Sequence, residues 1–101
     1  MKVVVQNGAN NGLSRGEVEA MFEFFPNSWK TAVSKVMLVA GNDASATHFP
    51  KEQIVSVSCP RSLAFQGKAQ ATRALVYAVA HATKEEPSEE LQARCISVLK
   101  A

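Results

Sequence analysis

Four side chains of this sequence carry groups that could take part in catalysis or metal binding: His48, Cys59, Tyr77 and His81. Tyr77 and His81 are four positions apart, which places them one turn apart on one face of a helix. Together the four residues form a candidate pocket for a small metal- or anion-dependent enzyme. A zinc site would require further carboxylate or thiolate ligands, and the histidines have none at a diagnostic spacing. We therefore assign no catalytic residue, no metal ligand and no cofactor.

Two further features lie where a reactive site could form, but the residues that would complete the site are absent. Cys59 follows a predicted strand, where a thiolate nucleophile can be stabilised. A phosphate-binding loop of the cysteine-phosphatase type would need arginine six positions later, where the chain has Phe65. The glycines in 8–14 suit a phosphate-binding turn before a helix, but the lysine of such a loop is absent. We predict an inward-facing structural thiol and an ordinary turn.

The first half of the chain contains the elements that precede this pocket. The β-branched run 2–6 predicts a strand, and 35–40 predicts a second one. Ser14 begins a helix, because Glu17 can complete a capping box and apolar residues then recur at helical spacing. Pro26 is expected to end this helix, and Trp29 to cover the core under a turn.

The second half supplies the elements that would position the pocket. A polar loop is expected from 41 to 53, and a strand over 54–59 with one apolar and one polar face. The nearly uncharged stretch 69–82 predicts a helix that is covered on most sides. A last helix begins at Pro87 and Ser88. The predicted order is β-α-β-β-α-α, a small α+β domain with helices packed on a small sheet.

Length and composition point to a single domain over 1–101. A chain of 101 residues suffices for one hydrophobic core. Its hydrophobic fraction of 47% and charged fraction of 20% are those of a globular protein. Two cysteines without a signal peptide favour reduced thiols and a cytoplasmic location. The apolar runs are too short to span a membrane.

The net charge of +2 argues against a nucleic-acid partner, because phosphate binding requires clustered cations. One local asymmetry exists between Glu52 and Glu85, an interval without acidic residues. It contains a candidate basic patch, formed by Arg61, Lys68, Arg73 and Lys84. A solvated helix face and loop is the simpler interpretation, and a nucleic-acid accessory protein is an alternative.

The element order and the run 75–81 resemble the minimal zincin-type metallopeptidase domain. In that family an apolar helix carries His-Glu-x-x-His, whose histidines bind zinc and whose glutamate activates water. The motif would place Tyr77 at the first histidine, Ala78 at the glutamate and His81 at the second. Only His81 matches, so the resemblance implies a scaffold that has lost the peptidase site.

The sequence does not determine a biochemical function. The leading hypothesis is a non-catalytic interaction or structural domain, with a protein partner, on a zincin-like scaffold. The small metal- or anion-dependent enzyme is the first alternative, and the nucleic-acid accessory protein is the second. The oligomeric state is left open.

Overall fold

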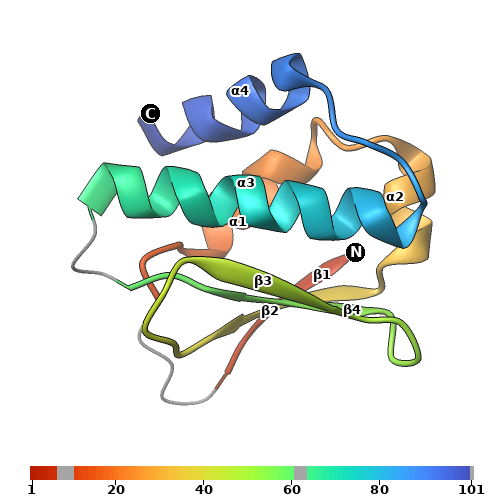
Figure 1. The fold of residues 1–101 in the computed structure, drawn as a ribbon, viewed down its shortest axis with the longest axis horizontal. Helices are drawn as coiled ribbons and strands as arrows, with labels where there is room; N and C mark the ends of the chain where they lie inside the picture. The colour runs from red at the N-terminus through yellow and green to blue at the C-terminus, as the bar shows by residue number, and fades with distance from the viewer. Residues whose placement is uncertain (7–10, 61–63, 101) are drawn as a thin grey trace.

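The apolar runs of the chain form strands of a four-stranded sheet in the order β1-β2-β4-β3, in which β1 and β3 are the edge strands (Figure 1). The computed structural model of the protein describes residues 1–6, 11–60 and 64–100. Strands β1, β2 and β4 are parallel, whereas β3 runs antiparallel to β4. This arrangement confirms the α+β class. The elements are β1 (Lys2–Val5), α1 (Arg15–Phe22), α2 (Asn27–Ala32), β2 (Lys35–Val39), β3 (Ser45–Phe49), β4 (Ile54–Ser58), α3 (Ala64–Ala82), α4 (Glu89–Ser97) and a closing 3-10 turn (Val98–Lys100).

Helix α1 begins as its sequence predicts. The Ser14 hydroxyl accepts a hydrogen bond from the Glu17 amide at 3.1 Å, and the Ser14 amide donates to the Glu17 carboxylate at 2.8 Å. This capping box satisfies two amides that a helix start otherwise leaves without partners. Helix α4 is capped by Ser88 with a single bond, because its hydroxyl accepts from the Leu91 amide at 3.1 Å.

The segment after α1 differs from the prediction. Helix α1 ends at Phe22, four residues before Pro26, and Pro26 instead precedes the short helix α2. Trp29 therefore lies on a helix and not under a turn, although it is buried. Its ring packs 5.3 Å from that of Phe25, which itself lies 5.6 Å from the Phe22 ring. This aromatic cluster holds the turn between α1 and α2 against the core. The helical spacing of the apolar residues did not predict this turn.

The prediction of a polar loop over 41–53 is wrong, because 45–49 form strand β3. The strand lacks the alternation that marks a half-buried strand, since none of its side chains is fully buried. It lies at the sheet edge and is held by backbone pairing with β4, where Ser45 faces Ser58 and Phe49 faces Ile54. Together β3 and α2 change the predicted order from β-α-β-β-α-α to β-α-α-β-β-β-α-α.

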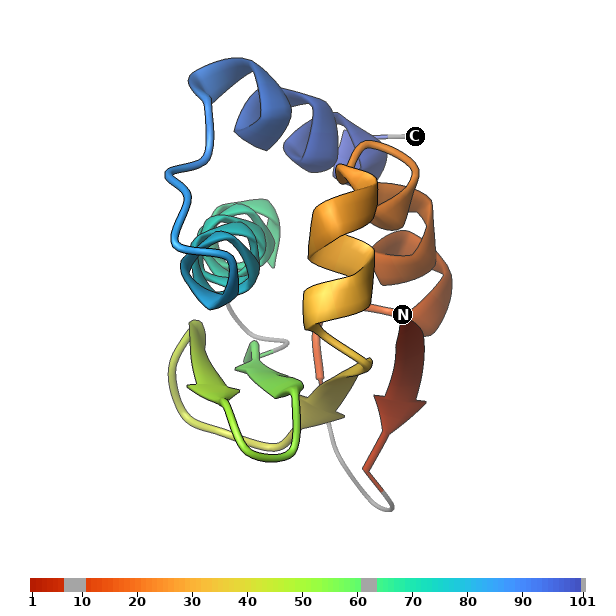
Figure 2. The ribbon, with the colours of Figure 1, turned by 90° about the vertical axis from the view of Figure 1, so that its right-hand side faces the viewer.

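All the helices in the described part of the chain lie on one side of the sheet (Figure 2). Helix α3 packs over β3 and β4, α1 packs beside β1, and α4 forms an outer layer against α3 and α1. We call the covered side of the sheet the helical face. Five of its side chains are almost fully buried: Val3, Val36, Leu38, Val55 and Val57.

Helix α3 begins at Ala64, earlier than the predicted Ala69, and is covered on fewer sides than expected. Leu75, Val76 and Val79 are buried, as are the smaller Ala71, Thr72 and Ala80. Tyr77 and His81 instead face solvent, and Tyr77 is 43% exposed. The helix is nearly uncharged because alanine occupies many of its positions, and alanine at a half-exposed position costs little. No described helix is long and apolar enough to cross a membrane.

The other side of the sheet, which we call the open face, carries no described helix (Figure 2). Because side chains alternate along a strand, the open face consists of the positions between the buried ones. They are Lys2, Val4, Lys35, Met37, Val39, Ser45, Thr47, Phe49, Ile54, Ser56 and Ser58.

Candidate functional site

The structure separates the four residues of the candidate pocket. Tyr77 and His81 lie together on the exposed side of α3, with ring centroids 6.1 Å apart in an edge-to-face arrangement. His48 lies on β3, at a position that faces α3 and is half-buried. Its paired residue on β4 is Val55, whereas Cys59 comes four residues later, roughly 13 Å along the strand. Cys59 therefore lies near the opposite end of the sheet from His48.

Neither cysteine has the surroundings of an activated thiol. Both are buried and free. Burial raises the pKa of Cys59, and its effect exceeds the opposing influence of the Gly12 amide and of Lys68. Burial also raises the pKa of Cys95 to about 11. Both thiols are thus protonated at neutral pH, whereas a nucleophile or metal ligand would be a thiolate.

Among the described residues, no group of three or more His, Cys, Asp or Glu side chains could hold a metal ion. Residues 7–10 of the glycine-rich turn and Arg61 of the basic patch lie outside the described residues. The three described cations of that patch are not clustered. Lys68 is paired with Glu17, whereas Arg73 and Lys84 are exposed. Lys68 and the end of α3 at Ala82 are separated by roughly 21 Å of helix.

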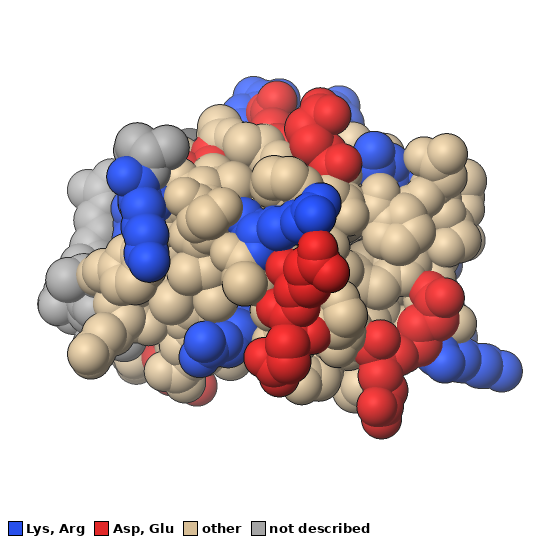
Figure 3. Space-filling model, turned by 90° about the horizontal axis from the view of Figure 1, so that it is seen from above, with Lys and Arg blue, Asp and Glu red and all other residues tan. Residues whose placement is uncertain are grey.

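On the helical side of the molecule, the described basic residues do not gather into one area (Figure 3). In Figure 3, which is viewed from above the helices, basic and acidic side chains alternate across the surface. A nucleic-acid surface would instead gather cations along one face.

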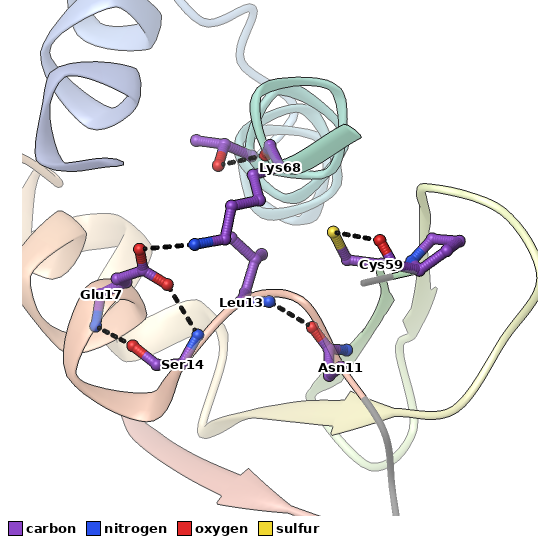
Figure 4. A network of polar contacts seen from close by, with 8 residues as sticks. Asn11, Leu13, Ser14, Glu17, Cys59 and Lys68 are labelled. Carbon is purple, nitrogen blue, oxygen red and sulfur yellow. Dashed lines mark hydrogen bonds and ion pairs between the residues drawn. The ribbon is translucent and has the colours of Figure 1, made fainter. Parts of the chain in front are cut away.

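A polar network connects the carboxyl ends of β2 and β4 with the start of α1. Figure 4 shows the part of the network that joins Asn11 to Leu13 and Glu17 to Ser14 and Lys68. The Asn11 amide nitrogen donates to the Val39 carbonyl at 3.0 Å and to the Val57 carbonyl at 2.9 Å. Its amide oxygen accepts from the Leu13 amide at 2.8 Å. Asn11 is buried, and these three bonds use both of its donor hydrogens and its acceptor. It therefore fixes the segment before α1 to the sheet.

Lys68 of α3 completes this network from the other side. Its ammonium group lies 3.1 Å from the Glu17 carboxylate, and both side chains are partly buried. Burial raises the pKa of Glu17, but the hydrogen bonds from Ser14 and the Lys68 charge outweigh burial and leave the pKa lowered. Glu17 thus serves both the cap of α1 and the contact between α1 and α3.

A cavity of about 540 Å³ opens beside this network, with Val5, Ser14, Glu17 and Lys68 in its lining. Its position at the carboxyl ends of parallel strands is a common one for ligand sites. The polar side chains here are already paired, however, because Glu17 accepts from both the Ser14 amide and Lys68. The network therefore accounts for the packing of three elements without a ligand.

The open face differs from the candidate pocket and from the polar network. Its apolar residues, which we call the open-face patch, are Val4, Met37, Val39, Phe49 and Ile54. Phe49 is 45% exposed, and the other four are only half-buried. None of them contacts the hydrophobic core, which gathers on the helical face. Contiguous exposed apolar side chains of this kind mark interaction surfaces.

The sequence contained a signal for the open-face patch. Runs 3–5 and 36–39 are apolar at every position, a pattern typical of strands buried on both faces. In the structure only one face of these strands is covered by described elements. The roles of Asn11 and Lys68 had no such signal, because their partners are distant in sequence.

Comparison of the chain with family models, curated proteins and solved structures found no match.

Proposed function

We propose that this domain is a non-catalytic interaction domain that binds a protein partner through the open face of its sheet. One observation carries the proposal: β1 and β2 place apolar side chains on both faces of the sheet, beside one lysine each on the open face, and the described helices cover only the other face. Val4, Met37 and Val39 would lose their remaining contact with water in a complex. Burial of apolar surface is the main driving force of protein association.

The non-catalytic part of the proposal rests on the residues of α3. Tyr77 and Ala78 stand where the zincin motif has its first histidine and its glutamate. We propose that the domain has a zincin-like scaffold without the peptidase site. The packing of α3 against a small mixed sheet is compatible with that origin. One equivalent of zinc held per chain after dialysis, measured by atomic absorption, would contradict this part.

The interaction part is tested by affinity capture with matched variants. The open-face variant Met37→Glu/Ile54→Glu places two charges in the patch, whereas Gln70→Glu/Tyr77→Glu places two on the exposed side of α3. We expect the wild-type domain and the α3 variant to capture the same protein, and the open-face variant to lose it. The captured protein is then purified, and its affinity is measured for the wild-type domain and for each of the two variants.

Two results would overturn the proposal. In one, only the α3 variant loses the partner, so that the exposed side of α3 is the interface. In the other, purified partner binds all three forms with equal affinity. Circular dichroism of each variant shows whether the loss follows from unfolding.

A further inference from the structure

The open face has a charge pattern that its own fold does not require. Lys2 and Lys35 are paired positions on β1 and β2, and both lie on this face. Like charges at paired positions destabilise a sheet. Neither lysine forms an ion pair with a described residue, and none of the described open-face positions is acidic. Carboxylates from outside the domain would remove this repulsion.

The lysines lie at one end of the open-face patch. Lys35 pairs with Ile54 on its other side, and Ile54 with Phe49, so the two charges continue directly into apolar side chains. Val4 and Met37 form the next row along the strands. A matching surface is therefore apolar, with acidic groups along one end.

The dimensions of the open face match one helix. The four strands span roughly 14 Å, and the five-residue strands β2, β3 and β4 are roughly 16 Å long, because strands are about 4.8 Å apart and rise about 3.3 Å per residue. At one end, the connection between β2 and β3 lies against Ser58. A helix is about 10 Å wide, and about eleven residues cover the strand length. Such a helix covers roughly 160 Å² and the whole face roughly 230 Å², both far below the 800 Å² or so that each subunit of a stable dimer contributes. A second copy of the chain therefore fits the face less well.

An isolated extended strand would not use this surface either. A strand pairs with the edge of a sheet through its backbone, whereas the face of a sheet packs against helices or against another sheet. The other side of the same sheet is already covered by helices: β1, with the buried Val3, packs against α1, and β4, with the buried Val55 and Val57, packs against α3.

We infer that the partner of the open face is an amphipathic helix of another protein, with acidic side chains at the end that lies over Lys2 and Lys35. This inference rests on the proposed function and specifies its partner. The contact area gives weak and reversible binding.

Two synthetic peptides test the chemistry of the partner. Both are eighteen-residue helices with leucine at positions i, i+3, i+4 and i+7; one carries glutamates beside the leucine stripe, and the other carries lysines. Binding is measured by fluorescence anisotropy at low salt, and NMR shifts of backbone amides locate the contact. We expect the acidic peptide to bind at least about tenfold more tightly, with shifts on β1, β2 and β4.

Two variants of equal net charge separate local from overall electrostatics. Lys2→Glu/Lys35→Glu reverses the charges of the open face, and Arg73→Glu/Lys84→Glu reverses two exposed charges on the α3 side. The first should reverse the preference between the peptides. The second should leave the affinity for the acidic peptide within about twofold.

Several outcomes would overturn the inference: equal affinity for both peptides, shifts on α3, equal effects of the two variants, or no binding. Dimerisation lost on Met37→Glu, seen by sedimentation, would assign the face to a second copy. If phosphatidylserine vesicles displaced the acidic peptide, the open face would be assigned to a membrane surface. If neither peptide binds but the open-face variant still loses a captured protein, the proposed function stands and only the helical partner is wrong.

Discussion

Leu38 and Met37 are neighbours on β2, yet their surroundings differ because they point to opposite faces of the sheet. Leu38 is 1% exposed and packs in the core, whereas Met37 is half-buried with no described helix above it. Both side chains are large and apolar. The comparison shows that the buried side chains of the helical face form the hydrophobic core, whereas the apolar side chains of the open face lie outside it.

The largest expected effect comes from truncating these two neighbours. Leu38→Ala should lower the free energy of unfolding by about 3 kcal/mol, because it leaves a cavity in a packed core. Met37→Ala should lower it by less than about 1 kcal/mol, since that side chain is already partly in water. Urea denaturation at two protein concentrations measures the loss of stability of both variants. Equal losses would show that the open face is covered in solution.

Asn11→Ala should have the next largest effect, because it removes three buried hydrogen bonds at the carboxyl ends of β2 and β4. It leaves the carbonyls of Val39 and Val57 without their donor, and we expect a loss of about 2 kcal/mol. Thermal unfolding measures this loss of stability. Asn42→Ala, at an exposed position, is the control and should change stability by less than about 0.5 kcal/mol. Similar losses for both variants would contradict the role of Asn11.

Gly41→Ala tests the place where the connection between β2 and β3 approaches the open face. A methyl group at Gly41 would lie 2.5 Å from the Ser58 side chain, so the connection must shift. We expect a loss of about 1.5 kcal/mol by denaturant titration. Gly16→Ala is the matched control, because a methyl group there meets nothing within 4 Å. On a helix it should instead stabilise by about 0.5 kcal/mol. A stable Gly41→Ala variant would disprove this close approach.

The smallest expected effect concerns pH. The pKa of Glu17 is lowered in the folded chain, so its contribution is fully present above its ordinary value of 4.5 and is lost as the pH falls through the lower folded value. Glu17→Gln should cost about 1 kcal/mol at neutral pH and reduce the loss of stability below pH 4.5. Stability measured from pH 7 to pH 3 shows the difference. Glu19→Gln, at an exposed pair, is the control and should change stability at neutral pH by less than about 0.5 kcal/mol.

The candidate site was less predictable than the fold. The spacing of Tyr77 and His81 correctly places them on one side of a helix, as their edge-to-face rings show. Whether that side faces a cleft, the core or solvent depends on where α4 and β3 pack, and the structure exposes it to solvent. The open-face patch was present in the sequence as apolar runs, but which face is covered depends on the path of the connections.

By itself, the sequence determined the local elements: the strands 2–5, 35–39 and 54–58, the capped start of α1 and the start of α4 at Ser88. The strands depend on β-branched and apolar runs, and on alternation in 54–58, whereas the helix starts depend on hydrogen bonds between residues three apart. Only the tertiary structure decided that β3 is a strand, that Asn11 joins two strand ends, and that one face of the sheet carries no described helix. Each of these depends on contacts between residues far apart in the chain, which no local pattern encodes.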